Sequence, residues 1–162
     1  MYIKCNDMNN TAAMELEKEI QQKKFKDQYQ KLAVNLIYTG NWMVLQHARL
    51  LKPHGLTPQQ YNVLRILRGQ HPTPCTVGTI VERMLDMNSN ASRILDRLVA
   101  KGLADRKQCP NDRRAVDVLI TKDGLKLLEE VDKEVDKMER QFAAISETDA
   151  KTLNELLDAL RG

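Results

Sequence analysis

Apolar residues recur at helical spacing along most of the chain, whereas the alternation typical of a half-buried strand occurs in one region only. Helical stripes and the capping residues before them predict helices over about 32–52, 57–67, 76–85, 88–102, 123–142 and 146–160. Two runs, 103–107 and 115–121, are strand-like, and turn residues separate them. The pattern therefore predicts a mainly α protein with one small β-hairpin.

The fourth predicted helix has two unlike faces. Ala91, Leu95 and Leu98 fall on one side of it, and the helix is expected to begin after Asn88 as N-cap and to stop at Gly102. The opposite side is polar and carries Ser89, Asn90, Ser92, Arg93 and Arg97. Such a helix can pack on a core with one face and meet a polar partner with the other.

The loop between the two strand-like runs has the sequence Gln-Cys-Pro-Asn-Asp-Arg-Arg over 108–114. Pro, Asn and Asp favour turns, because proline fixes φ and the short polar side chains bond to nearby backbone. Arg113 and Arg114 are therefore expected at a loop tip, with Asp112 beside them.

A short predicted helix comes immediately before the fourth one. Thr76 is the expected N-cap, residues 86–88 form a tight turn, and the inward residues are expected to be Val77, Ile80, Val81 and Met84. Helix, turn and helix at this spacing are typical of a helix-turn-helix unit, and the hairpin that follows is typical of a wing. The predicted fold is a winged helix-turn-helix.

Charge is unevenly distributed along the 162 residues, although the formal net charge is only +3. Residues 88–121 carry seven Lys or Arg against four Asp, which is 7 − 4 = +3, and residues 123–162 carry six against eleven acidic residues, which is 6 − 11 = −5. The helix and hairpin thus suit a polyanion such as double-stranded DNA, and the C-terminal helices do not.

The C-terminal helices carry narrow apolar stripes that suit pairing with another helix. With no sheet to cover, they are expected to pack between two subunits of a homodimer. The candidate dimerisation residues are Leu125, Leu128, Val131, Val135, Leu153, Leu156, Leu157 and Leu160.

Several other classes of function find no support in the sequence. His47, His54 and His71 lack the spacing of metal ligands, and no nucleophile or phosphate loop stands in a catalytic signature, so no enzyme, metal or cofactor is predicted. No apolar run could span a membrane and no signal peptide is evident, so a cytoplasmic protein is expected. Cys109 lies near several cations that would favour its thiolate, which makes it a possible redox switch beside the bland alternative of a tolerated turn residue.

These residues together resemble the MarR family of winged helix-turn-helix transcription regulators. The resemblance rests on Ser92-Arg93, on the helix exit over 98–106, and on the Asp-Arg-Arg run from 112 that leads to Thr121 and Gly124. It extends from Tyr29 to the C-terminus. Residues 1–28 lie outside it and are expected to form an N-terminal arm, largely helical over 11–31.

The resemblance implies an organisation and a function. Residues 29–55 and 123–162 would be dimerisation helices, and 56–122 would be the DNA-binding lobe. Arg114 would enter the minor groove, oriented by Asp112, although either wing arginine could insert. The expected function is a homodimeric regulator, such as a repressor, on a pseudo-palindromic operator, released by a small effector or by oxidation. The alternative is a winged-helix module that binds acidic protein partners.

Overall fold

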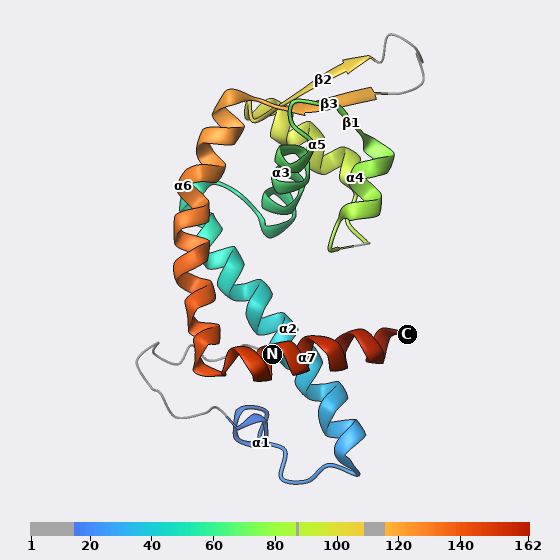
Figure 1. Ribbon diagram of the computed structural model, residues 1–162, viewed down its shortest axis with the longest axis vertical. Coiled ribbons are helices and arrows are strands. Elements are labelled where there is room, and N and C mark those ends of the chain that lie inside the picture. Colours follow the sequence, from blue (N-terminus) through green and yellow to red (C-terminus); the bar gives the residue numbers. More distant parts are fainter. Residues whose placement is uncertain (1–14, 87, 109–115) are drawn as a thin grey trace. The chain divides into compact units, whose positions relative to one another are not determined.

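The computed structural model describes residues 15–86, 88–108 and 116–162 (Figure 1). The chain divides into two compact units, 1–43 and 44–162, and the boundary falls inside the long helix α2 (Gln28–Leu51). None of the helices among the described residues is both long enough and apolar enough to cross a membrane.

The first unit contains the short helix α1 (Leu16–Glu19) and the first part of α2. Lys31 of α2 pairs with Glu17, and the hydroxyl of Tyr38 donates to Glu19 Oε2 over 3.0 Å. The prediction of a helix across 11–31 was wrong between Ile20 and Asp27, where the chain is not helical. That stretch has no apolar face to bury, and helix propensity alone rarely sustains a short helix.

The second unit has the elements expected of a winged helix. In chain order they are the end of α2, η1 (Lys52–His54), α3 (Pro58–Gln70), β1 (Cys75–Thr76), α4 (Val77–Arg83), α5 (Ala91–Ala100), β2 (Ala104–Gln108), β3 (Val116–Ile120), α6 (Lys122–Glu139), η2 (Arg140–Ala144) and α7 (Glu147–Arg161). The strands form one antiparallel sheet in the order β1-β3-β2, in which Val118 lies opposite both Cys75 and Arg106. The mainly α fold with a small hairpin is confirmed, and the two-residue strand β1 is an addition to it.

Three helix starts in this unit have the caps that the sequence favours. Thr57 and Gln60 form a reciprocal capping box at the start of α3, with Pro58 in the first turn. Thr76 caps α4 by accepting from the backbone N–H of Thr79, and Ser146 caps α7 by accepting from that of Asp149. These starts were predictable because each cap is a side-chain oxygen that accepts from the backbone N–H three residues later.

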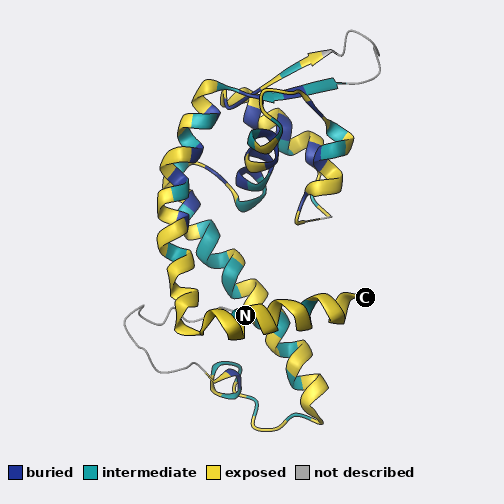
Figure 2. Cartoon of the chain, viewed as in Figure 1, coloured by how far each residue is buried: buried dark blue, intermediate teal, exposed yellow. Residues whose placement is uncertain are grey.

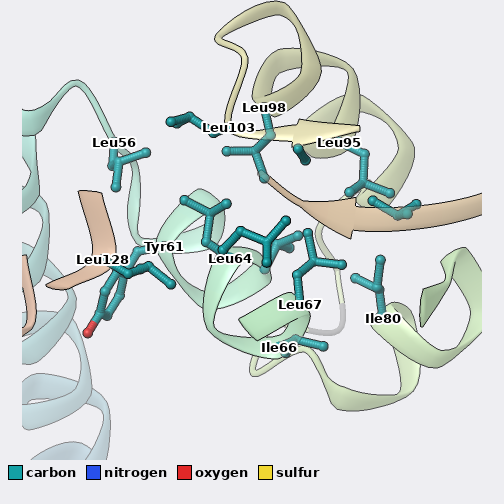
Figure 3. Packing of buried hydrophobic residues seen from close by; sticks show 14 of the residues in the cluster. Leu56, Tyr61, Leu64, Ile66, Leu67, Ile80, Leu95, Leu98, Leu103 and Leu128 are labelled. Atoms are coloured by element: carbon teal, nitrogen blue, oxygen red, sulfur yellow. The ribbon is translucent and has the colours of Figure 1, made fainter. Parts of the chain in front are cut away.

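An aliphatic core lies between α3, α4, α5 and the sheet (Figure 3). Its fully covered side chains include Leu64, Leu67, Ile80, Leu95, Leu98 and Val118. Val81 was expected to face inward with Ile80, but its side chain is 49% exposed. Helix α4 has only seven residues, so its buried face is narrow.

Helix α6 completes this core instead of leaving its apolar stripe free. Leu128 and Val131 are fully buried, Val135 is 4% exposed, and Leu125 packs against the same cluster. Their own chain therefore covers Leu128, Val131 and Val135, and a part for these four residues in a subunit interface stays a prediction. Helix α7, by contrast, is exposed along its length (Figure 2), and Leu153, Leu156 and Leu160 are 49%, 63% and 58% exposed while Leu157 is half-buried.

A polar contact joins α3 to α6 beside the core. The Tyr61 hydroxyl donates to Asp132 Oδ1 over 2.9 Å, and the Arg68 guanidinium pairs with the other oxygen of the same carboxylate. Tyr61 is 4% exposed. Burial, and then the hydrogen bond to Asp132, raise the pKa of Tyr61 to about 12.

The Tyr61→Phe variant should lose about 1.5 kcal/mol of unfolding free energy at neutral pH, since it loses a hydrogen bond to a charged acceptor. The unfolded tyrosine ionises near pH 10 and the folded one near 12, so the wild-type advantage should shrink as pH rises through this window. Denaturant titrations of both proteins at a series of pH values measure this difference in unfolding free energy. Tyr29→Phe, at a tyrosine that is 83% exposed, is the control and should show neither effect.

Gly124 permits the start of α6 to lie directly on the end of α5. A Cβ at this position would lie 2.3 Å from the Leu103 carbonyl oxygen and 2.8 Å from Ile120 Cγ1. Thr121 Oγ1 meanwhile accepts from the Gly124 N–H over 3.0 Å and donates to the Gly102 carbonyl over 2.7 Å. The wing strand and α6 are thereby held against the exit of α5.

Gly124→Ala should destabilise the protein by roughly 1–3 kcal/mol, because the methyl group meets backbone that cannot yield easily. Gly40→Ala is the matched control: it lies in the interior of α2 with nothing within 4 Å of the added carbon, and should stabilise by roughly 0.5–1 kcal/mol. Thermal melts of both variants make the comparison. Equal melting temperatures would contradict the close approach.

Candidate nucleic-acid interface

Helix α5 presents a polar face outward because three of its apolar residues pack in the core. Ala91, Leu95 and Leu98 are buried in the core, as predicted, while Arg93 and Arg97 are exposed. Among the described residues, neither arginine has an ion-pair partner. These two exposed guanidinium groups lie one helical turn apart, an arrangement suited to an external anion.

The start of α5 differs from the prediction. Its N-cap is Asn90, whose Oδ1 accepts from the Arg93 backbone N–H over 3.0 Å, so the expectation of Asn88 as cap was wrong. Asn88 lies two residues earlier, in the preceding turn, and its backbone N–H donates to Asp86 Oδ1 over 3.1 Å. Ser89 consequently lies in the turn before α5, and Ser92 lies in its exposed first turn.

The turn before α5 is organised by the carboxylate of Asp86. Besides the Asn88 amide, it accepts from the Ser89 hydroxyl over 2.6 Å and from Gln59 Nε2 over 3.4 Å. Donation by Ser89, by the Asn88 amide and by Gln59 holds the pKa of Asp86 below its usual range. A second contact from α3 fixes the same turn, since Asn62 Oδ1 accepts from the Leu85 N–H over 3.1 Å.

A polar pocket lies between this turn, the outer face of α5 and the start of α3. The start of α3 contributes Thr57, Gln59 and Gln60, and the other wall is formed by Ser89, Asn90, Arg93, Ile94 and Arg97. Four of the predicted DNA-binding residues, Ser89, Asn90, Arg93 and Arg97, are therefore brought together, while Ser92 lies outside the pocket. Hydroxyl, amide and guanidinium groups together can bind both phosphate oxygens and base edges.

The far end of α5 is also attached to neighbouring elements. Lys101 Nζ donates to the Gly55 carbonyl and, over 3.1 Å, to Oε1 of the buried Gln60. Gly102 has φ 69°, the left-handed stop that was predicted. On the helix itself, Asp96 pairs with Arg106 of β2, which joins α5 to the wing.

The wing tip and two of the cysteines lie outside the described residues. Asp112, Arg113, Arg114 and Cys109 fall in 109–115, and Cys5 falls in 1–14. Cys75 is 2% exposed, and burial raises the pKa of its thiol. A buried thiol with a raised pKa is a poor nucleophile, so Cys75 is unsuited to sensing oxidation.

The side chains that hold this surface in place could not be predicted from the sequence. Gln59, Asn62 and Asp86 contribute no apolar periodicity, and their contacts join residues 23 and 27 positions apart. One local signal was present, because Asp followed by polar residues two and three positions later favours a side-chain turn. No group of three or more metal-ligating side chains gathers within the described part of the chain.

Comparison with known proteins agrees with this geometry. Residues 54–115 match the model of the MarR family. The chain is 30% identical over 108 residues to the HTH-type transcriptional regulator MhqR of Bacillus subtilis, covering 64% of this chain and 71% of that protein.

Solved structures point to the same family. A MarR transcription factor from Planctomyces limnophilus is 32% identical, with a TM-score of 0.63 over 85% of this chain and 98% of the other. The S. aureus MepR–DNA complex has a TM-score of 0.72 at 20% identity, over 85% and 97% of the two chains, and shares the fold. With these relatives and a winged helix built around α5, the chain belongs to the MarR family of transcription regulators and is not an enzyme.

Proposed function

We propose that this protein is a cytoplasmic regulator that binds double-stranded DNA as a homodimer on a pseudo-palindromic operator. Residues 56–122 form the DNA-binding lobe, and 29–55 with 123–162 supply the dimerisation helices. Helix α5 enters the major groove, and the wing, with Asp112, Arg113 and Arg114, contacts the adjacent minor groove. MepR, which has the same fold, has been crystallised with DNA, and that supports this use of the fold.

The observation that carries the proposal is the outward face of α5. Arg93 and Arg97 have no ion-pair partner within the described residues, and Asn90 and Ser89 line the same pocket. Ala91, Leu95 and Leu98 of the same helix are buried in the core, and two cations without a partner among the described residues add nothing to that packing. They suit an external polyanion, and an arginine fork can pair with guanine.

Helix α7 supports the homodimer. Leu153, Leu156 and Leu160 are all more than 45% exposed on one short helix, and Phe142 and Ile145 just before it are each 43% exposed. Apolar side chains gathered in this way favour association, and a second copy of the chain is the partner always present at equal concentration.

Control of binding completes the proposal. The protein acts as a repressor, and a small effector or oxidation releases it from DNA. For oxidation, Cys109 is the favoured thiol, since it neighbours Lys107 and the wing arginines in sequence while Cys75 is buried.

Removing either outward arginine should weaken DNA binding and reduce its salt dependence. In a fluorescence anisotropy titration from about 50 to 200 mM salt, wild type should show a steep fall in affinity, with a logarithmic slope of roughly −0.9 per phosphate contacted. Arg97→Ala should flatten the slope if it binds phosphate, and Arg93→Ala should relax base preference at a cost of about 1–3 kcal/mol. Lys151→Ala on α7 is the control. A shallow wild-type slope would contradict specific DNA binding.

Disrupting the apolar face of α7 should dissociate the dimer without unfolding the lobe. Leu156→Lys places a charge on the exposed stripe, whereas Asn154→Lys places the same charge on an exposed polar position of the same helix. Sedimentation velocity should show monomer for the first and dimer for the second. A dimeric Leu156→Lys variant would move the interface away from α7.

A further inference from the structure

An acidic side chain stands at the edge of the surface assigned to DNA. Asp86 is exposed, lies in the turn directly before α5, and forms no salt bridge within the described residues. A carboxylate at this position repels phosphate and should weaken binding to any DNA. Asp86 must therefore favour DNA binding in some other way if the repulsion is to be offset.

The hydrogen bonds of Asp86 hold the turn before α5 in place. One oxygen accepts from the Asn88 N–H over 3.1 Å, and the other accepts from Ser89 over 2.6 Å and from Gln59 over 3.4 Å. These donors belong to two separate elements, the turn and the first turn of α3. The carboxylate thereby joins the entry of α5 to a helix that is anchored in the core.

The same contacts limit what Ser89 can do. Its single hydroxyl proton is donated to Asp86, so toward DNA Ser89 can only accept. Ser89 and Gln59 both line the pocket beside Arg93. Because the Asp86 carboxylate bonds to both, it fixes the position of the turn relative to α3. Direct readout of bases requires such placement, because a guanidinium shifted along the groove meets another base edge.

We propose that Asp86 is a positioning residue for sequence-selective binding: it fixes the turn before α5 through Ser89, Asn88 and Gln59 without contacting DNA. This role rests on the proposed function. It makes a prediction opposite to simple electrostatics, because removing a negative charge here should lower selectivity instead of raising affinity on every sequence.

The test measures selectivity. Full-length wild type first enriches a preferred duplex from a library with a random central segment, and that duplex and a scrambled duplex of equal composition serve as probes. Asp86→Ala should bind the selected duplex about tenfold more weakly, the loss expected from hydrogen bonds to a charged group, while binding of the scrambled duplex stays equal or improves. Thermal melts record folding of each variant.

Two variants separate position from charge. Glu82→Gln removes another exposed carboxylate, at the end of α4, and should leave the ratio of the two affinities unchanged. Gln59→Ala keeps the carboxylate but removes the donor from α3, and should also lower the ratio of the two affinities. It therefore tests the role of Asp86 even if Asp86→Ala folds poorly.

The possible outcomes are distinguishable. If wild type enriches no sequence, the proposed function fails and the role of Asp86 fails with it. If wild type is selective but Asp86→Ala and Gln59→Ala keep the full ratio, or Asp86→Ala tightens binding to both duplexes as a charge removal would, only the role of Asp86 is refuted.

Discussion

The packing of α5 against α3 and the sheet is the constraint on which the rest of this surface depends. Leu95 and Leu98 are fully buried, and exposing either side chain by rotating the helix would cost about 1.5–3 kcal/mol. The rotation of α5 about its axis is therefore set by the core. Arg93 and Arg97 point outward as a consequence of apolar burial, before any polar contact is considered.

Burial fixes the rotation of α5 about its axis. Polar contacts at both ends of the helix fix its position along that axis. Asp86 and Asn62 hold the entry, and Lys101 holds the exit through Gly55 and Gln60. The start of α3 takes part at both ends, since Gln59 reaches the entry and Gln60 the exit. Two consecutive glutamines of α3 thus contact the two ends of α5.

Local patterns predicted most of these elements, because most of the signals involved lie within one helical turn. Thr57 and Gln60 were recognisable as a capping box because both partners lie within one turn. Asn88 and Asn90 were equally good caps by residue type, and the helix begins after Asn90, whose side chain accepts from the Arg93 N–H. Strand β1 is only two residues long and exists by pairing with β3, far along the chain, so no local periodicity could reveal it.

The C-terminal helices show why an apolar stripe in the sequence does not predict which helix it packs against. Spacings of three and four residues from Leu125 onward describe a face suited to another helix, but the same spacing serves a helix of the same chain or of a second copy. Burial distinguishes the two cases. Along α6 the covered positions end at Val135, and from Phe142 onward every apolar side chain of the described C-terminal segment is partly or largely exposed. The core of one chain is complete at Val135, so any association through the C-terminal helices must depend on the apolar side chains beyond that residue.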